Sequence, residues 1–283
     1  MDKREYLKPF RCFGGAMLAI GVITALFTLA SSPLAILFSN ASDLVTVLVT
    51  LYSYYLIYRI FIKKYHIALF PGSPVRKDRR WQCLLACVLA FAVIRFSWLL
   101  YYRLLARTPY WQALADEEGE LSIFMILYVA ILAPLAEEIV FRGWFLKVLR
   151  RYGTAVAVFF TAIAFGMMHG TVTQSIPAFF IGIVLAILAI RYESLVPGII
   201  LHVINNSLSF LTFNEEPLFV FYLVLMAVAI IMLLFAERRN LSRLPAQMKT
   251  FFRLSVSSIS FILFMIIYVG LIVFDYVAMV RGL

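Results

Sequence analysis

The chain has 283 residues, of which 64% are hydrophobic and only 14% are charged. Soluble globular domains are about half apolar and about a quarter charged, so this composition excludes that class and indicates a membrane protein. The formal net charge is +10. Because the basic residues stand beside apolar segments, we expect them to contact the anionic headgroups of a lipid bilayer, and we expect no nucleic-acid partner.

Nine apolar runs occur along the chain, each near the roughly 20 residues that a helix needs to cross a hydrocarbon core about 30 Å thick. They cover residues 12–38, 42–62, 82–106, 121–146, 154–169, 175–190, 195–212, 218–236 and 258–280. A transmembrane barrel would alternate polar and apolar residues, whereas these runs are continuously apolar. The sequence therefore predicts an all-α fold, a polytopic transmembrane helix bundle of about eight or nine spans, with residues 1–283 as a single integral membrane domain.

Most of the 25 Lys and Arg residues precede the first run or follow the second, fourth, sixth and eighth runs. The other connections carry acidic residues, namely Asp43, Asp116, Glu117, Glu118, Glu120, Glu215 and Glu216. Short loops rich in Lys and Arg stay in the cytoplasm. We therefore expect a cytoplasmic N-terminus and an outer C-terminus. The basic cytoplasmic loops and the lack of an organelle signal favour a bacterial inner membrane.

Several ionisable residues lie within the expected spans, namely Arg95, Glu137, Glu138, Arg142, His169, His202 and Asp275. Such residues are costly in a membrane, so they usually face the interior of the bundle, pair with one another and mark functional sites. Most of them come from three neighbouring spans. Arg95 and Asp275 lie elsewhere, and we expect these two to pair structurally or to reach the membrane surface, without a catalytic role.

The sequence APLAEEIVFRGWF carries the first group of charges. Glu138 and Arg142 stand four residues apart on one helical face, so we expect them to form an ion pair. Glu137 projects about 100° away and is left without a partner on its own helix. A carboxylate in this position suits a general base. Pro134 is expected to bend the helix and to expose backbone groups to a water-filled cavity.

Two later spans contribute FGMMH, which ends at His169, and HVINN, which runs from His202 to Asn206. A glutamate and a histidine together can hold and deprotonate a water molecule. The second histidine and the asparagine amide can donate hydrogen bonds to an oxyanion. The four groups outline a hydrolytic site.

These three motifs resemble those of the CPBP intramembrane proteases, which include the type-2 CAAX prenyl proteases and the Abi proteins. The family patterns EExxxR, FxxxH and HxxxN appear in the same order as EEIVFR, FGMMH and HVINN, within a core at residues 121–212. The resemblance implies hydrolysis of peptide bonds in a membrane-associated or lipidated protein or peptide. It also implies a role for each matching residue: Glu137 activates water, His169 orients it, His202 and Asn206 stabilise the oxyanion, and Glu138, Arg142 and Phe165 support the site.

Two alternatives stay open on the sequence alone. Glu137, His169 and His202 could form a zinc site, although a metal-free mechanism is preferred because it also gives Asn206 a role. The other alternative is an inactive membrane scaffold, or a protein of the bacteriocin-immunity type, that uses the same polar cluster to bind a partner. The sequence contains no HExxH, GxSxG or GxGD motif, so other types of intramembrane protease are not indicated.

Overall fold

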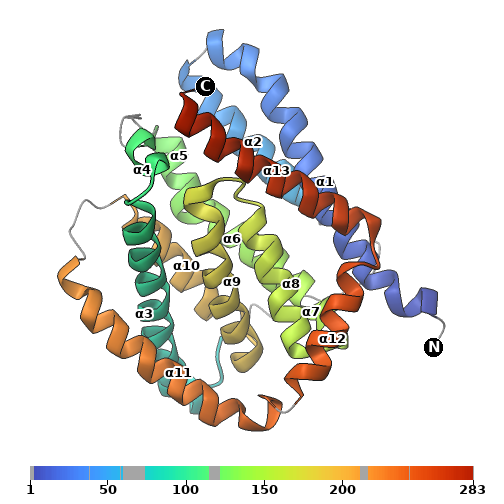
Figure 1. The fold of residues 1–283 in the computed structure, drawn as a ribbon, viewed down its shortest axis with the longest axis vertical. Coiled ribbons are helices and arrows are strands. Elements are labelled where there is room, and N and C mark those ends of the chain that lie inside the picture. Colours follow the sequence, from blue (N-terminus) through green and yellow to red (C-terminus); the bar gives the residue numbers. More distant parts are fainter. Residues whose placement is uncertain are drawn as a thin grey trace.

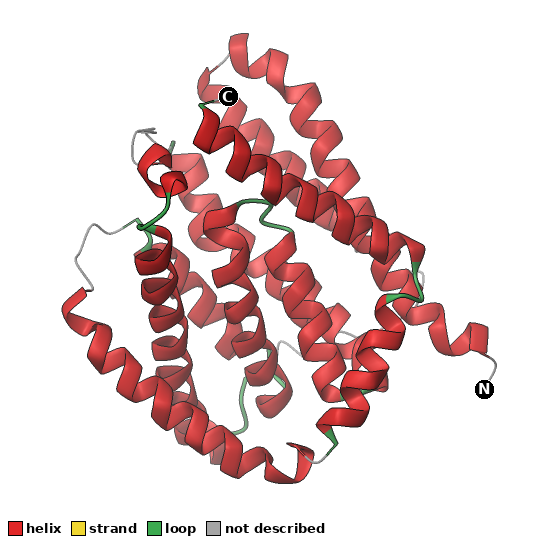
Figure 2. Ribbon diagram, in the orientation of Figure 1, coloured by secondary structure: helices red, strands yellow, loops and turns green. Residues whose placement is uncertain are grey.

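The computed structural model describes residues 3–37, 39–57, 59, 74–114, 122–210, 216–241 and 243–282. Nearly all of these residues are helical and none of them lies in a strand (Figure 2). The prediction of an all-α fold is therefore confirmed. Such a fold satisfies backbone N–H and C=O groups within each helix, as a hydrocarbon environment requires.

Figure 1 shows the helices packed into one bundle, with α8 near its centre. The α-helices are α1 (Lys3–Leu37), α2 (Ser39–Ile57), α3 (Arg80–Leu105), α4 (Pro109–Leu114), α5 (Ile123–Leu127), α6 (Ala133–Glu137), α7 (Leu146–Leu149), α8 (Thr154–Met167), α9 (Val172–Tyr192), α10 (Val196–Leu208), α11 (Phe219–Leu241), α12 (Leu244–Ser255) and α13 (Ile259–Arg281). The part between α5 and α7 is continuously helical, because π-helical turns join the three short α-helices there.

Six of the described helical segments are long and apolar enough to cross a membrane, and three shorter ones are apolar as well. The long segments are Tyr6–Ile23, Lys77–Leu105, Ile123–Tyr152, Val172–Tyr192, Phe219–Ala236 and Ile259–Arg281, and the shorter ones are Val47–Leu56, Thr154–Met167 and Val196–Leu208. Each of these segments overlaps one of the nine apolar runs of the sequence, and the first differs most, covering Tyr6–Ile23 where the run covers 12–38. Between the last two runs the chain is also largely helical, because α11 continues to Leu241 and α12 spans Leu244–Ser255.

The helices α1 and α13 pack side by side in a parallel arrangement (Figure 1). A Cβ atom placed on Gly14 would lie 2.8 Å from Cβ of Phe261, and one placed on Gly21 would lie 2.8 Å from the ring of Tyr268. Residue numbers thus increase in the same direction along both helices. The end of α13 therefore lies at the opposite end of this helix pair from the start of α1.

The side of the membrane on which each end lies stays a prediction. Several charged residues on which that prediction depends lie outside the described residues, namely Lys63, Lys64, Asp116, Glu117, Glu118, Glu120 and Glu215.

Close packing of α8 against α9 fixes the centre of the bundle. A Cβ atom on Gly166 would lie 2.6 Å from the carbonyl oxygen of Ser175, and one on Gly182 would lie 2.9 Å from Cα of Ala162. Glycine at these two positions lets the helix backbones approach, as small residues do between membrane helices. The end of α8 is thereby placed against α9, and this end carries the second sequence motif.

Candidate active site

The helical segment that carries Glu137 is irregular on both sides of that residue. It changes from α-helix to π-helix at Tyr128–Leu132 and again at Glu138–Phe145. The N–H of Ala133 bonds to the carbonyl of Tyr128, five residues earlier, instead of the four of an α-helix. Single π-helical turns are rare and often occur at functional sites. Sequence reasoning predicted a bend at Pro134 but gave no indication of π-helical turns.

Glu138 and Arg142 form the ion pair that their spacing predicted. The distance from Nη1 of Arg142 to Oε1 of Glu138 is 2.7 Å, and each side chain is only 1% exposed. Nη2 of Arg142 also donates a hydrogen bond of 3.4 Å to the carbonyl of Gly182 in α9. The guanidinium lies over the ring of Phe165, 4.4 Å from its centroid. This pair therefore ties the EExxxR segment to both α8 and α9.

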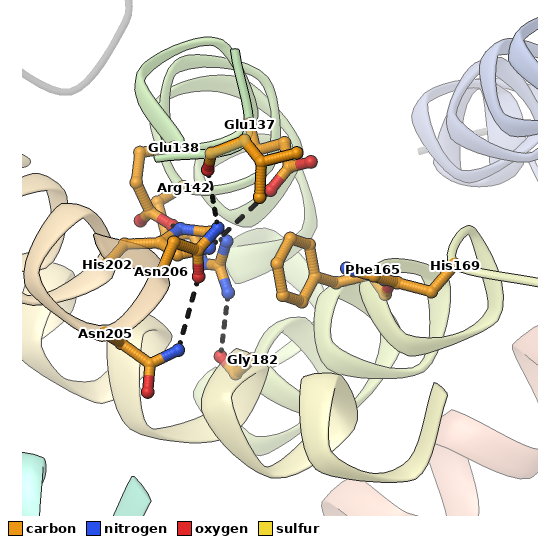
Figure 3. Close-up of polar contacts among 10 residues, drawn as sticks. Glu137, Glu138, Arg142, Phe165, His169, Gly182, His202, Asn205 and Asn206 are labelled. Atoms are coloured by element: carbon orange, nitrogen blue, oxygen red, sulfur yellow. Dashed lines mark hydrogen bonds and ion pairs between the residues drawn. The ribbon is translucent and has the colours of Figure 1, made fainter. Parts of the chain in front are cut away.

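His202 connects the two adjacent glutamates (Figure 3). Its Nδ1 lies 3.0 Å from Oε1 of Glu138, and its Nε2 lies 3.7 Å from Oε2 of Glu137. A carboxylate accepts hydrogen bonds, so a proton on Nδ1 makes the bond to Glu138 and Nε2 is the nitrogen directed to Glu137. Gly198 permits this approach, because a Cβ there would lie 3.2 Å from Oε2 of Glu138.

Glu137 stands beside Glu138 on the helix, and both carboxylates face His202 (Figure 3). The side chain of Glu137 is 15% exposed. The hydroxyl groups of Tyr54 in α2 and of Tyr128 lie close enough to this carboxylate to interact with its charge. Sequence reasoning found neither tyrosine, because the run that contains Tyr54 carries several tyrosines and shows no motif around it.

His169 follows the last turn of α8. Its Nδ1 lies 2.8 Å from the carbonyl oxygen of Phe165. A carbonyl only accepts, so Nδ1 carries the proton, and Nε2 of the neutral ring is left as an acceptor. The ring of Phe165 meets the rings of both His169 and His202 edge to face, at centroid distances of 5.1 and 5.7 Å. Phe165 thus holds the two histidines in a fixed relation.

The amide of Asn206 is held at both of its ends. Its Oδ1 accepts a hydrogen bond of 3.2 Å from Asn205, and its Nδ2 donates one of 3.0 Å to the carbonyl of Val129. Asn205 in turn accepts a bond of 3.3 Å from Nη1 of Arg95 in α3. The orientation of the Asn206 amide is therefore set by α3 and by the π-helical turn together.

A cavity of about 570 Å³ adjoins these groups, within the usual size range of small-molecule sites. It is lined by Arg95, Trp98, Leu99, Tyr102, Trp111, Leu114, Val129, Phe165, His169, Thr173, Gln174, Ala178, Ile181, His202, Asn205, Asn206, Leu208 and Ser209. The second and third motifs thus meet at one cavity. Glu137 contacts this cluster of residues through His202, whose Nε2 lies 3.7 Å from Oε2 of Glu137. Sequence reasoning missed Arg95 and Asn205 as members of the site.

Asp275 of α13 has partners that the sequence did not indicate. Its Oδ2 accepts hydrogen bonds from the hydroxyl of Tyr110, at 2.9 Å, and from the N–H of Val172, at 2.8 Å. Burial, together with the hydrogen bond to Asp275, raises the pKa of Tyr110 to about 12, so this hydroxyl stays a donor. Asp275 therefore anchors the start of α9 just after His169. Of the two alternatives expected for Asp275, a structural pairing and a position at the membrane surface, these contacts correspond to the structural pairing.

The zinc alternative can be tested against the donor geometry. Within the described part of the chain, no three His, Cys, Asp or Glu side chains are grouped as the ligands of a metal ion would be. Glu137, His169 and His202 therefore do not form a ligand set in this arrangement of the helices.

Comparison with known protein families gives a match to the part of the chain that carries the candidate site. The sequence model of the type II CAAX prenyl endopeptidase Rce1-like family matches residues 119–208, about one third of the chain. No curated protein and no solved structure gave a match. The matched residues contain all three motifs, so the resemblance to the CAAX-type proteases is confirmed over this segment. Together with the apolar helices, the match makes the chain an integral membrane protein.

Proposed function

We propose, from the membership of residues 119–208 in the type II CAAX prenyl endopeptidase Rce1-like family, that the chain is an intramembrane endopeptidase that uses glutamate-activated water. Its substrate would be a membrane-associated or lipidated protein or peptide. The observation that carries this proposal is the position of His202, whose Nε2 lies 3.7 Å from Glu137 while its ring lines the same cavity as His169 and Asn206.

In the first step, Glu137 takes a proton from a water molecule as the water oxygen forms a bond to the carbonyl carbon of the peptide. His169 accepts a hydrogen bond at Nε2 from the remaining O–H of that water, because its Nδ1–H donates to the carbonyl of Phe165. The carbonyl oxygen then carries the negative charge of the tetrahedral intermediate. In the second step, the C–N bond breaks and Glu137 returns the proton to the departing amine.

Two groups stabilise the oxyanion. An asparagine amide has two N–H groups, and the bond to Val129 uses one of those of Asn206, so the other can donate to the oxyanion. His202 donates from Nε2 when its ring carries a second proton. Its Nδ1–H donates to the carboxylate of Glu138 at 3.0 Å, which orients the ring. Preorganised donors of this kind supply a large part of the rate enhancement in acyl transfer.

Arg142 and Phe165 support these groups without touching the substrate amide. Arg142 balances the charge of Glu138, which would otherwise be a buried anion with no compensating cation on its helix. Phe165 separates the two histidine rings and lies under the Arg142 guanidinium. We propose further that the protein resides in a bacterial inner membrane with its N-terminus in the cytoplasm.

The test compares membrane peptides in cells that carry the wild type with those in cells that carry Glu137→Ala. We expect peptides or proteins that are shortened only in the presence of the wild type. Purified wild type should then cleave the same peptides in detergent or in vesicles, and Glu137→Ala should not. An identical peptide pattern in the two strains would instead favour the scaffold or immunity function.

A further inference from the structure

The helix α12 connects two membrane helices, α11 and α13 (Figure 1). The apolar segment of α11 ends at Ala236 and that of α13 begins at Ile259, and each is long enough to cross a membrane. The chain between two consecutive spans begins and ends at the same membrane surface. α12 has 12 residues, which gives a length of about 18 Å against about 30 Å for a hydrocarbon core. This helix therefore lies at that surface.

One face of α12 is fixed to the bundle. Leu254 is fully buried, and the ring centroid of Phe251 lies 4.4 Å from that of Phe160 in α8. The side-chain oxygen of Gln247 accepts a hydrogen bond of 2.8 Å from the N–H of Ala155, in the first turn of α8. Gln247, Phe251 and Leu254 follow one another at intervals of four and three residues, so they share a helical face. The opposite face of α12 points away from the protein.

The outward face of α12 combines positive charge with exposed apolar side chains. Lys249 and Arg253 stand four residues apart, and both are exposed. Phe252 and Val256 lie on the same side of the helix and are 68% and 75% exposed. No acidic residue occurs in α12. Basic residues beside bulky apolar ones are typical of a helix that lies in the membrane interface, with its apolar groups at the boundary of the acyl chains.

The surroundings of Arg253 place this face at the basic end of the bundle. Its Nη2 lies 3.4 Å from the hydroxyl oxygen of Tyr6 in α1, a neutral group that leaves the charge of the guanidinium in place. Tyr6 packs edge to face against Tyr152, at a centroid distance of 5.0 Å, and Arg151 beside it is exposed. The start of α1 and α12 therefore lie at the same surface, which is the cytoplasmic one in the proposed topology. Anionic lipids give that surface of a membrane its negative potential.

We propose that the outward face of α12 binds the headgroups of anionic phospholipids, with Lys249 and Arg253 at the phosphates and Phe252 among the acyl chains. Inorganic phosphate would offer a partner to the two cations only, whereas a lipid also gives the exposed apolar side chains an apolar environment. Because Gln247 on the other face binds the first turn of α8, a lipid held by α12 also steadies the start of that helix. The proposal does not depend on the proposed protease function.

The experiment measures backbone hydrogen exchange of residues 244–256 by mass spectrometry, on the full chain in nanodiscs. The discs contain phosphatidylcholine alone or phosphatidylcholine with phosphatidylglycerol. For wild type, phosphatidylglycerol should slow the exchange by about 5-fold or more, which is the contribution of one basic residue near an anionic surface. Inorganic phosphate added to phosphatidylcholine discs should leave the exchange unchanged.

Variants assign the effect to the outward face. Lys249→Gln combined with Arg253→Gln should remove the lipid effect, and Lys249→Arg combined with Arg253→Lys should keep it. The matched control combines Lys77→Gln with Arg80→Gln, which removes the same charge from exposed residues at the start of α3 and should leave the effect on α12 intact. Thermal unfolding checks that each variant is folded. A photoreactive phenylalanine analogue in place of Phe252 should form crosslinks to phospholipid.

Four outcomes would overturn the proposal. Equal exchange of wild type in the two kinds of disc would show that α12 does not bind anionic lipid. Slower exchange with inorganic phosphate alone would identify a soluble anion as the ligand. Loss of the lipid effect in the control variant would show that the net charge of the protein, and not the face of α12, attracts the lipid. Crosslinks from position 252 to protein alone would show that this face is covered by another chain.

Discussion

The side-chain amide of Asn206 donates a hydrogen bond of 3.0 Å to the backbone carbonyl of Val129. The carbonyl of Val129 is available for this bond because of the π-helical turn, in which the N–H of Ala133 donates to the carbonyl of Tyr128, five residues earlier. In the same register the next residue would donate to Val129, but that residue is Pro134, which has no N–H. Asn206 supplies the missing donor from another helix. The proline and the asparagine therefore act together, although they lie far apart in the sequence.

This relation predicts how two substitutions combine. Asn206→Ala should lower the free energy of unfolding by about 0.5 to 1.5 kcal/mol, because the carbonyl of the half-buried Val129 loses a donor. It should also lower turnover by roughly 100-fold to 1000-fold, as expected for one lost oxyanion donor. Adding Pro134→Ala restores a backbone N–H and should recover part of the stability but none of the turnover. Thermal unfolding in detergent and peptide turnover measure the two effects. Recovery of both together would contradict the oxyanion role of Asn206.

Glu137→Gln should abolish peptide hydrolysis and leave the protein folded. The amide keeps the volume of the side chain but cannot take a proton from water. Turnover of a lipid-embedded peptide is the measurement, with the thermal unfolding curve as the control for folding. Full activity in this variant would refute the general-base role and would require another catalyst.

Arg142→Ala should destabilise the protein by about 3 to 5 kcal/mol, because it leaves Glu138 as a buried charge without its partner. The matched control is Arg76→Ala, which breaks a pair of similar length, 3.0 Å, whose side chains are 79% and 61% exposed. That pair is expected to contribute only about 0 to 1 kcal/mol. Equal losses in the two variants, measured by thermal unfolding, would mean that the buried pair adds no more than a surface pair.

The parallel packing of α1 and α13 predicts that the two ends of the chain lie on opposite sides of the membrane. The distribution of basic residues assigns the N-terminus to the cytoplasm. Reporter domains fused before Met1 and after Leu283 should therefore report different compartments. The same compartment for both fusions would imply that one of the nine segments does not cross the membrane.

A metal-free site predicts that purified, active protein contains no stoichiometric zinc and keeps its activity in the presence of chelators. Elemental analysis and a chelator titration of turnover make this test. Activity that is lost with a chelator and restored by zinc would replace the glutamate mechanism with a metal-assisted one, in which the ion lowers the pKa of bound water to about 7.

The sequence by itself determined the fold class and the motif residues of the candidate site, including the pair of Glu138 and Arg142. Continuous apolar runs predict membrane helices because backbone polar groups in hydrocarbon must bond within their own segment. The spacing of Glu138 and Arg142 predicts their ion pair because residues four apart share a helical face. These features depend on neighbours in the chain, so they could be read from short stretches of sequence.

Only the tertiary structure decided which groups complete the site. The bond between Asn206 and Val129 joins residues 77 apart, the bond between Arg95 and Asn205 joins residues 110 apart, and Asp275 reaches Val172 across 103 residues. No spacing in the sequence specifies such contacts, because they depend on how separate helices pack. The π-helical turns also escaped prediction, since the same residues fit a regular α-helix. The surroundings of the motif residues were therefore fixed by the packing of α3, α10 and α13 around them.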